Sequence, residues 1–580
     1  MSLLALLRYA KNYKKELILG PFFKLLEAVL ELLLPLYMAK LIDQGISQQD
    51  TAYTIKMGLY MLAMSIVGLI CVLICQYYAS IASQGFGTEL RKKMMTQINS
   101  FSHRELDYFG TSTLITRTTS DINQLQLALA MLIRLVIRAP FLSIGSIIMA
   151  FYIDVQMGIV FLVTIPVFSF VLFVIMKKTV PLYKKVQLTL DQLNEHLRQS
   201  LSGVRVIRAF AKKETDKVAF NEVTDELAHS YQQVTNLSAL LSPITTFIMN
   251  LAIISILYFG GINVNTGRLS SGEVLALINY MTQMLLALIV VSNLVVIFTK
   301  SFASASRVNE VFDTKPIVST TPPPKETTPW KEDTVLSFQN VTFRYTEDSG
   351  DVLRHITFDL RKGQTLGIIG PTGSGKTTLI ELISGFYPIK DGHILLNQQD
   401  ISTFDTGNLR QHVSVAAQKS VLFSGTVRSN LLMGKPDATN DECLLALEMA
   451  QCFDFIPNSK EGLDTPVLAN GNNFSGGQRQ RLNIARALIK PADIIVLDDS
   501  LSALDYQTDL LIRQNLNNHY PDSTLIIISQ RVSSIKDCQQ IIVLDEGKAV
   551  GLGSHNTLLK ESVFYQKIAA SQQEKEANYV

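Results

Sequence analysis

Long apolar stretches fill the first half of the chain and end near Thr299, beyond which short apolar runs alternate with polar segments. Six of these stretches hold roughly the 20 apolar residues that a helix needs to cross the hydrocarbon of a bilayer. They lie near residues 18–42, 57–80, 128–152, 155–177, 240–261 and 274–298. The pattern predicts six membrane-spanning helices. The first and the fifth are the least regular, because Lys24, Glu27, Glu31 and Asn250 interrupt them.

The basic residues of the connections predict the orientation of these helices. No Lys or Arg lies between Lys40 and Lys56 or between Arg138 and Lys177, and only Arg268 lies between the fifth and sixth stretches. The two other connections are basic, and each has about 50 residues with helical periodicity, too long for simple connectors. The positive-inside rule therefore predicts that both termini and these two loops are cytoplasmic, with helices that continue beyond the membrane. The N-terminus lacks the pattern of a cleavable signal peptide, so the first span is expected to direct insertion.

The second half has the composition of a water-soluble domain. The segment Lys315–Pro329 is rich in Pro and Thr and predicts an extended linker. After it, strand-like alternation and helical runs predict an α/β domain of roughly 240 residues. The expected division is a membrane domain at 1–313, a linker at 314–334, an α/β domain at 335–570 and a frayed polar tail at 571–580.

The composition agrees with a chain that lies partly in a membrane and partly in water. At 580 residues the chain is too long for a single core. Its mean hydropathy is +0.22, and its charged fraction of 18% is below that of soluble proteins. A formal net charge of +2 gives no basic excess, so nucleic acid is not an expected partner. The five cysteines form no CxxC pair, and Cys71 and Cys75 are expected to be small buried side chains rather than metal ligands.

Residues 370–377 read GPTGSGKT and match the complete phosphate-loop pattern G-x-x-x-x-G-K-[ST]. They follow the apolar strand TLGII and open the helix TTLIELISGF, which is the context that the pattern requires. Backbone N–H groups freed by the glycines can wrap phosphates, with the positive end of the helix behind them. Lys376 is expected to reach the β- and γ-phosphates, and the Thr377 hydroxyl to hold Mg²⁺. The predicted ATP ligands here are Gly370, Pro371, Thr372, Gly373, Ser374, Gly375, Lys376, Thr377 and Thr378.

A second motif is the apolar run Ile494–Asp498, which ends in a carboxylate. In P-loop NTPases an Asp at this place holds the metal. Any buried strand can end in Asp, but behind a complete phosphate loop the motif becomes informative. Asp498 is therefore predicted to be a Mg²⁺ ligand together with Thr377.

Residues 474–482, FSGGQRQRL, resemble the signature segment of ABC ATPases, with Phe474 where the family most often has Leu. In this family the signature faces the nucleotide held by the opposite domain, so that two domains enclose two ATP molecules. The resemblance implies that Ser475, Gly476, Gly477 and Gln478 act on the ATP of a partner chain.

This resemblance extends over nearly the whole chain and implies further roles. Tyr345 resembles the aromatic residue that stacks on adenine. Gln418 resembles the glutamine that contacts Mg²⁺ and senses the membrane domain, and Ser502–Asp505 resembles the loop that crosses the dimer seam. The segments that resemble ABC exporters in the membrane half are 114–121, 194–210 and 305–312.

Three positions depart from the family pattern. Asp499 stands where the family has Glu, the carboxylate that polarises the attacking water, and Gln530 stands where it has His. Asp is shorter by one methylene and Gln has no cationic form, and loss of well-placed base catalysis costs about 10²–10⁴-fold in rate. Neutral drift is the alternative, but both changes together favour a degenerate site that holds ATP and cleaves it slowly. Residues 467–471 also lack a Glu that exporters usually have, which leaves that contact to the membrane domain in doubt.

Charged residues inside the predicted spans have two readings. Lys24, Glu27 and Glu31 recur at near-helical spacing in the first span, and Arg134 and Arg138 do so in the third. Charges in a bilayer must face protein or a water-filled cavity. They either pair with one another and hold the bundle together, or they line a cargo cavity whose carboxylates attract cationic amphipathic molecules.

The sequence thus predicts a six-span helical domain followed by a P-loop ABC ATPase, resembling the degenerate-site subunit of heterodimeric bacterial multidrug exporters. The expected cofactors are ATP and Mg²⁺, and the expected partners are a second half-transporter chain, the lipid bilayer and small amphipathic cargo. The plasma membrane is the expected location. Lipid or peptide export, a homodimeric lipid flippase and an ATP-gated regulator or channel remain alternatives.

Overall fold

The computed structural model describes residues 3–315, 333–347 and 349–577. The chain forms two compact units, one made of Met1–Gln97 and Ser112–Thr314 and the other of Ile98–Thr111 and Lys315–Val580. The second unit thus takes in a short segment from within the range 1–313. Most of the predicted linker lies outside the described residues.

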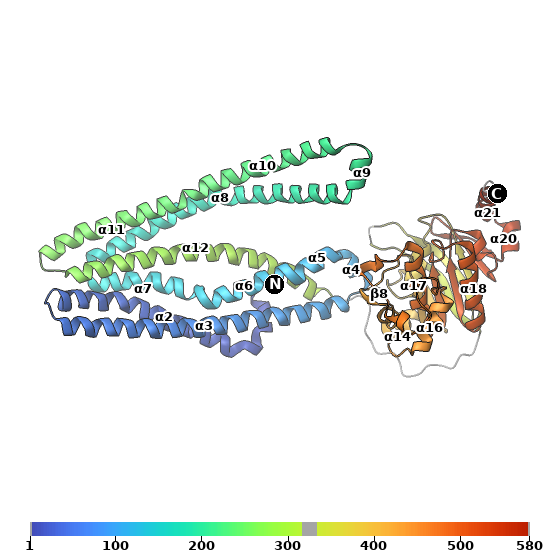
Figure 1. Cartoon of the computed structure of the whole chain (residues 1–580), viewed down its shortest axis with the longest axis horizontal. Helices are drawn as coiled ribbons and strands as arrows, with labels where there is room; N and C mark the ends of the chain where they lie inside the picture. The colour runs from blue at the N-terminus through green and yellow to red at the C-terminus, as the bar shows by residue number, and fades with distance from the viewer. Residues whose placement is uncertain (1–2, 316–332, 348, 578–580) are drawn as a thin grey trace. The chain divides into compact units, whose positions relative to one another are not determined.

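The first unit is entirely helical (Figure 1). Its elements are α1 (Leu3–Leu6), η1 (Leu7–Tyr13), α2 (Lys14–Lys40), η2 (Leu41–Ile46), α3 (Thr51–Asn99), α5 (Thr111–Thr116), η3 (Arg117–Asp121), α6 (Ile122–Met131), η4 (Leu132–Val136), α7 (Arg138–Ile153), α8 (Val155–Ser202), α9 (Val204–Ala209), α10 (Lys213–Ala239), α11 (Leu241–Asn265) and α12 (Ser271–Asp313). Helices α3, α8 and α12 contain 49, 48 and 43 residues, about twice what a bilayer crossing requires.

Among the residues that the structure describes, five helical segments are long and apolar enough to cross a membrane: Thr51–Asn99, Thr111–Ile153, Val155–Ser202, Lys213–Asn265 and Ser271–Asp313. They contain the second to sixth predicted spans. The predicted first span corresponds to α2, a helix of 27 residues with Lys24, Glu27 and Glu31 in its middle. Helix α2 is not among the five segments, so the first of the six predicted spans remains a prediction.

The core of the first unit gathers around α12. Tyr280, Met281 and Met284 of this helix are fully buried against α2, α7, α8 and α11. The Tyr280 hydroxyl donates to the Leu32 carbonyl at 2.5 Å and so joins α12 to α2. Helix α8 runs beside α10 and α11, as Figure 1 shows. Packing among helices, rather than the apolar content of each one, therefore defines this unit.

The second unit is an α/β domain. Its strands are β1 (Thr334–Phe343), β2 (Leu353–Arg361), β3 (Thr365–Ile369), β4 (Asp391–Leu396), β5 (Gln399–Asp400), β6 (Val413–Ala416), β7 (Gly425–Thr426), β8 (Pro466–Val467), β9 (Ile494–Asp498), β10 (Thr524–Ile528), β11 (Gln540–Asp545) and β12 (Lys548–Gly553). Its helices are α4 (His103–Phe109), α13 (Lys376–Ile383), η5 (Ile401–Thr403), α14 (Thr406–His412), α15 (Val427–Leu431), α16 (Asn440–Met449), η6 (Glu461–Asp464), η7 (Ala469–Gly471), α17 (Gly476–Leu488), α18 (Tyr506–His519), α19 (Val532–Ile535), α20 (His555–Glu561) and α21 (Val563–Ala577).

A six-stranded sheet of order β12-β11-β3-β10-β9-β6 forms the centre of this domain. All neighbouring strands in it are parallel except β11 and β12. One apolar core joins this sheet to α16, α17 and α18, and a second joins it to α13 and the antiparallel sheet β2-β1-β4-β5. Strands buried on both faces explain the continuous apolar runs of the sequence, such as TLIII in β10.

Helix α4 belongs to the second unit because its side chains contact that domain. Its start is capped by Ser102, whose backbone N–H donates to the Glu105 carboxylate at 2.8 Å, and it ends at Gly110 with a φ of 70°. The His103 ring stacks on Phe386 with centroids 4.1 Å apart. The short helix is therefore a docked element rather than an extension of α3.

The predicted polar tail at 571–580 begins within a helix in this structure. Helix α21 continues to Ala577, and the last three residues lie outside the described ones. The side chain of Gln572 accepts from the Val532 backbone N–H at 2.8 Å and donates to the Gln530 carbonyl at 2.7 Å. Polar composition alone suggested fraying, but these two tertiary hydrogen bonds hold the start of the tail in place.

Candidate nucleotide-binding site

The predicted nucleotide motifs meet at the carboxyl edge of the parallel strands. The phosphate loop follows β3, Asp498 ends β9, Gln530 follows β10 and Gln418 follows β6. Because adjacent parallel strands end at the same edge, four distant sequence segments come together there. They enclose a cavity of about 250 Å³. Its lining residues are Val352, Thr372, Gly373, Gly375, Lys376, Thr377, Thr378, Gln418, Asp498, Asp499, Ile528 and Gln530.

The loop after β3 has the backbone shape of an anion cradle. Gly373 and Gly375 have φ of 83° and 99°, values that side chains other than glycine rarely adopt. A Cβ at Gly375 would approach the Leu353 side chain to 2.6 Å, so close packing also requires glycine there. The Lys376 ammonium donates to the carbonyls of Gly370 and Pro371, each at 2.8 Å. The loop therefore curls around its own lysine, at the amino end of α13.

Two observations test whether an ATP phosphate fits this loop. The hydroxyl of Ser374 is buried without a hydrogen-bond partner among the described residues. Burial lowers the pKa of Lys376, while Asp499 and Asp498 act in the opposite direction. A buried hydroxyl and a desolvated ammonium both gain from an anion placed between them. The residues present thus fit a triphosphate.

The oxygen atoms suited to Mg²⁺ converge beside the loop. The Thr377 hydroxyl lies 3.5 Å from the Asp498 carboxylate, and Asp498 is 4% exposed. Burial, with the nearby Asp499, raises the pKa of Asp498 to about 6. Mg²⁺ prefers oxygen ligands and usually completes its shell with phosphate and water, so a hydroxyl and a carboxylate fit it. Gln418, which lines the same cavity, could supply an amide oxygen.

The two residues that depart from the family pattern lie side by side. The Gln530 and Gln418 side-chain amides donate to the same Asp499 carboxylate oxygen, at 3.4 and 3.3 Å. The other oxygen of Asp499 is buried without a hydrogen-bond partner among the described residues. Asp499 has a φ of 46°, so its position is set by the backbone of a tight turn. One carboxylate is thus held between two amides, and neither amide can accept a proton from water.

Sequence reasoning missed two residues that support this site. Gln572 binds the backbone on both sides of Arg531, as described above. The Arg531 guanidinium donates to the carbonyls of Ser502 and Leu504 at 3.0 and 3.2 Å. The loop after β10 is thereby joined to the segment Ser502–Asp505. No short motif announces these contacts, because both depend on residues far apart in the chain.

The signature segment lies apart from this cavity. Ser475 caps α17, accepting from the Gln478 backbone N–H at 3.3 Å, and the Gln478 side chain accepts from the Ser475 backbone N–H at 2.9 Å. Ser475 and Gly476 are exposed, and a Cβ at Gly476 would meet no atom within 4 Å. Phe474 packs instead against Phe455. None of the four predicted signature residues, Ser475, Gly476, Gly477 and Gln478, lines this chain's own nucleotide cavity.

Tyr345, the expected adenine-stacking residue, does not line the cavity either. Its hydroxyl lies 2.8 Å from the Thr378 hydroxyl and donates to the Glu381 carboxylate at 2.7 Å. Burial raises the pKa of Tyr345, so the hydroxyl keeps its proton. The aromatic ring is therefore anchored to α13 in this structure.

Comparison with known proteins agrees with these motifs. Residues 17–288 match the family described as ABC transporter transmembrane region, and residues 353–502 match the family described as ABC transporter. The chain is 34% identical over 574 residues, 98% of both chains, to an uncharacterized ABC transporter ATP-binding protein of Mycobacterium tuberculosis. The chain belongs to the ABC transporter family.

Other similar proteins extend the comparison. An uncharacterized ABC transporter ATP-binding protein of Bacillus subtilis is 33% identical over 573 residues, 98% of both chains. An ATP-dependent lipid A-core flippase of Syntrophus aciditrophicus is 29% identical over 498 residues, 85% of this chain and 82% of the flippase. The solved structure of a bacterial Atm1-family ABC exporter with ATP bound has the same fold, with a TM-score of 0.81, 22% identity and coverage of 96% and 98%. This ABC transporter therefore combines a helical membrane domain with an ATP-hydrolysing domain.

Inside the membrane half of the transporter, most of the singled-out charges pair with one another. Arg138 donates to both oxygens of Glu31, at 3.0 and 2.8 Å, and lies 3.6 Å from Glu27. Glu27 also forms an ion pair with Lys24. Arg134 donates to the Ser80 hydroxyl at 2.9 Å. The two carboxylates are therefore paired with basic side chains of α2 and α7 in this structure.

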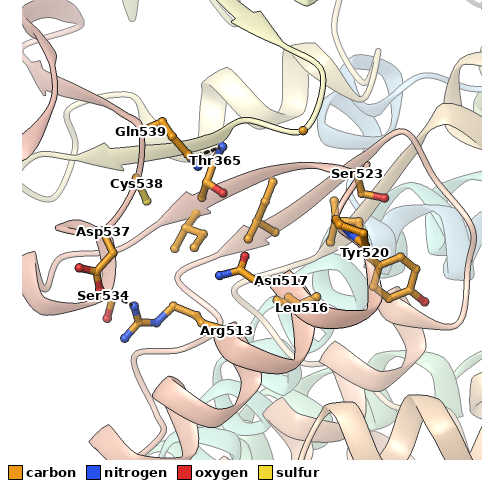
Figure 2. Close-up of a pocket in the computed structure, with 15 residues that line it drawn as sticks. Thr365, Arg513, Leu516, Asn517, Tyr520, Ser523, Ser534, Asp537, Cys538 and Gln539 are labelled. Atoms are coloured by element: carbon orange, nitrogen blue, oxygen red, sulfur yellow. Dashed lines mark hydrogen bonds and ion pairs between the residues drawn. The ribbon is translucent and has the colours of Figure 1, made fainter.

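A second cavity of the ATPase domain, of about 270 Å³, lies at the opposite, amino edge of the parallel strands (Figure 2). Arg513, Asn517 and Cys538 are among its lining residues. Arg513 is already paired with Asp509 at 3.0 Å and lies 3.5 Å from Asp537. Burial raises the pKa of the Cys538 thiol to about 12, so the thiol is unreactive. This cavity holds none of the nucleotide motifs.

Proposed function

We propose that this transporter is one subunit of a heterodimeric exporter, in which its own ATP site is degenerate. The observation that carries the proposal is the contact of Asp499 with both Gln418 and Gln530. Both amides hold this carboxylate by hydrogen bonds, and a glutamine cannot become a cation beside the γ-phosphate. The site would hold ATP and cleave it slowly.

Different residues of this chain would bind the phosphates, hold the metal and complete the partner's ATP site. The backbone of 370–378 and Lys376 bind the phosphates, and Thr377, Asp498 and Gln418 hold the metal. Mg²⁺ supplies charge neutralisation on the phosphate oxygens when bound. Asp499 fixes a water molecule less firmly than a longer Glu would. Ser475, Gly476, Gly477 and Gln478 complete the competent site, whose phosphate loop belongs to the partner.

The proposed topology has six spans in the plasma membrane, with α2 as the first. Both termini and the ATPase domain lie in the cytoplasm, as the positive-inside pattern predicts. The domain boundaries are those expected from the sequence, with a membrane domain at 1–313 and a nucleotide-binding domain at 335–570. Helix α4 would belong functionally to the second of these, because its contacts described above are with that domain.

Small amphipathic molecules are the proposed cargo, by resemblance to multidrug exporters. The engagement of Glu27 and Glu31 with Lys24 and Arg138 favours a structural role for these charges. A second candidate function is lipid export by a homodimer, and it is favoured by the relative described as a lipid A-core flippase.

The oligomer and its activity test the proposal. Mass measurement of the complex extracted from its native membrane is expected to find this chain with a second, different half-transporter. The purified chain alone is expected to bind ATP but to hydrolyse it at least about ten times more slowly than the pair. A homodimer that hydrolyses ATP as fast as the native complex would overturn the heterodimer and support the flippase-like alternative.

A further inference from the structure

The anchored ring of Tyr345 belongs to a cluster of aromatic, hydroxyl and carboxylate side chains that has no role in the function proposed above. Its hydroxyl contacts Thr378 and Glu381 of α13, and its ring meets Phe343 and Tyr387 edge to face, with centroids 5.0 and 5.1 Å apart. Burial raises the pKa of Glu381, and the nearby Asp107 adds to this. A tyrosine expected to meet the base is thus held by a second set of partners.

Tyr387 extends this cluster to α4. Its hydroxyl donates to the Asp107 carboxylate at 2.5 Å, and Tyr387 is only 7% exposed. On the same face of α4, His103 stacks on Phe386, and the Arg410 guanidinium lies 5.1 Å from the centroid of the Phe386 ring. A series of contacts therefore links Asp107 to Glu381. Asp107 accepts a hydrogen bond from Tyr387, Tyr387 meets the Tyr345 ring edge to face, and Tyr345 donates to Glu381.

The same cluster reaches the nucleotide cavity through Thr378. Thr378 lines the cavity, yet its hydroxyl is engaged by Tyr345. A phosphate bound by the loop competes for this hydroxyl, and a base that stacks on Tyr345 needs a free face of its ring. Tyr345 cannot keep all its present partners while it also releases the Thr378 hydroxyl to a phosphate and stacks on the base of a bound nucleotide.

We propose that Tyr345 is a latch: held by Glu381, Thr378 and Tyr387 it lowers nucleotide affinity, and bound nucleotide releases it and loosens the hold of Tyr387 on α4. Two sites, the cavity and the α4 contact, thereby become reciprocally coupled through one side chain. The inference rests on the proposed nucleotide function of this site. It assigns to Asp107 and Tyr387 the role of positioning residues for Tyr345.

The direction of the effect follows from linkage. Contacts present only without nucleotide must be broken on binding, so removing them makes binding tighter. A hydrogen bond to a carboxylate is stronger than a neutral one. We therefore expect Tyr345→Phe, which keeps the ring and loses the hydroxyl, to lower the Kd for nucleotide about three- to tenfold.

The experiment measures binding of the non-hydrolysable analogue AMP-PNP with Mg²⁺ to the full-length chain by equilibrium dialysis. Tyr387→Phe, which removes the bond to Asp107, is expected to lower the Kd about two- to threefold, and to add little in the Tyr345→Phe background. Tyr520→Phe is the matched control, because its hydroxyl donates to the Leu488 carbonyl at 2.6 Å and Tyr520 does not line the nucleotide cavity. Its Kd is expected to be unchanged.

Hydrogen exchange of the backbone amides of residues 103–109, in α4, is the second measurement. AMP-PNP is expected to speed exchange of these amides in the parent chain and to change it little in Tyr345→Phe. An unchanged or weaker Kd in folded Tyr345→Phe, or full additivity of the two substitutions, overturns the latch. Failure of the parent chain to bind AMP-PNP, or equal binding by Lys376→Ala, would instead overturn the proposed nucleotide site itself.

Discussion

At the scale of single residues, Asp499 and Gln530, which both differ from the family pattern, form one local structure. Its carboxylate accepts from Gln418 and Gln530, so changing only one of the departures leaves the other in place. A longer Glu could extend toward the cavity, but the Gln530 amide would still be a poor substitute for a group that can become cationic.

The first prediction concerns restoration of this site. Asp499→Glu together with Gln530→His is expected to raise ATP hydrolysis by the purified chain about 10–100-fold, while either change alone raises it less. Steady-state phosphate release measures the effect. Adding Lys376→Ala to the double variant should abolish the gain. Hydrolysis that stays at the parent rate in the double variant would show that these residues do not limit the site.

The second prediction concerns Glu31. Because Arg138 donates to both of its oxygens, Glu31→Gln is expected to lower stability by about 1 kcal/mol, a modest value for a partly exposed pair. This corresponds to a fall in Tm of about 2–4 °C. Transport of a cationic and a neutral dye should fall alike.

Arg134→Gln is the control for that variant. Among the described residues the ion pairs found do not include Arg134, and its side chain donates to Ser80. A smaller change in Tm is therefore expected. Selective loss of cationic dye transport with unchanged Tm in Glu31→Gln would favour the alternative in which the carboxylate attracts cargo.

At the scale of elements, two helices of the ATPase domain begin with nucleotide motifs but face different surroundings. Helix α13 starts inside the cavity, whereas the first residues of α17 do not line it. Each chain would therefore contribute to two different ATP sites.

The third prediction follows from this division. Gly477→Asp is expected to reduce hydrolysis by the native pair more than tenfold, because its carboxylate would meet the γ-phosphate of the partner's ATP. Lys376→Ala should weaken the slow site and reduce hydrolysis of the pair less. ATPase assays on the reconstituted pair compare them. Equal losses would contradict the division of labour.

The fourth prediction concerns α21. Its Gln572 bridges the Gln530 carbonyl and the Val532 N–H, so Gln572→Ala leaves two backbone groups without these bonds. Loss of about 1 kcal/mol of local stability is expected, with roughly fivefold faster exchange of the Val532 amide. Ser571→Ala is the matched control, since its hydroxyl bonds the Ile568 carbonyl of the same helix. Equal exchange in both variants would remove Gln572 from the support of the site.

At the scale of the whole molecule, orientation in the membrane is the property that charge patterning predicts most directly. The turn after η2 is non-basic, and the turn between α9 and α10 follows a basic helix. All five native cysteines are buried, so they should add little background to thiol labelling.

The fifth prediction tests the orientation in the membrane by labelling single introduced cysteines. A membrane-impermeant maleimide is expected to label Gln48→Cys in intact cells, and Lys212→Cys only after permeabilisation. Both positions are exposed in the structure. The parent chain, with its native thiols, is the control. Labelling of Lys212→Cys in intact cells would reverse the proposed topology.

Much of this protein was determined by the sequence alone, because the properties concerned are local. Five long apolar segments, the phosphate loop at 370–377 and the signature at 474–482 could be identified from residue type and spacing. The departures at Asp499 and Gln530 were equally visible. Helix periodicity and glycine-rich phosphate contacts depend on neighbours a few residues apart, so the order of residues is sufficient to indicate them.

The tertiary structure decided how distant residues meet. It engaged Glu27 and Glu31 with Arg138, joined α4 to Tyr387, docked Gln572 on the loop of Gln530, and held Asp499 between two amides. It also bonded the Tyr345 hydroxyl to Glu381. Each contact joins residues at least 31 positions apart in this chain, from 31 for Gln530–Asp499 to 280 for Asp107–Tyr387. Such pairings depend on how helices and strands pack, because hydrogen bonds and ion pairs require their partners within a few ångströms.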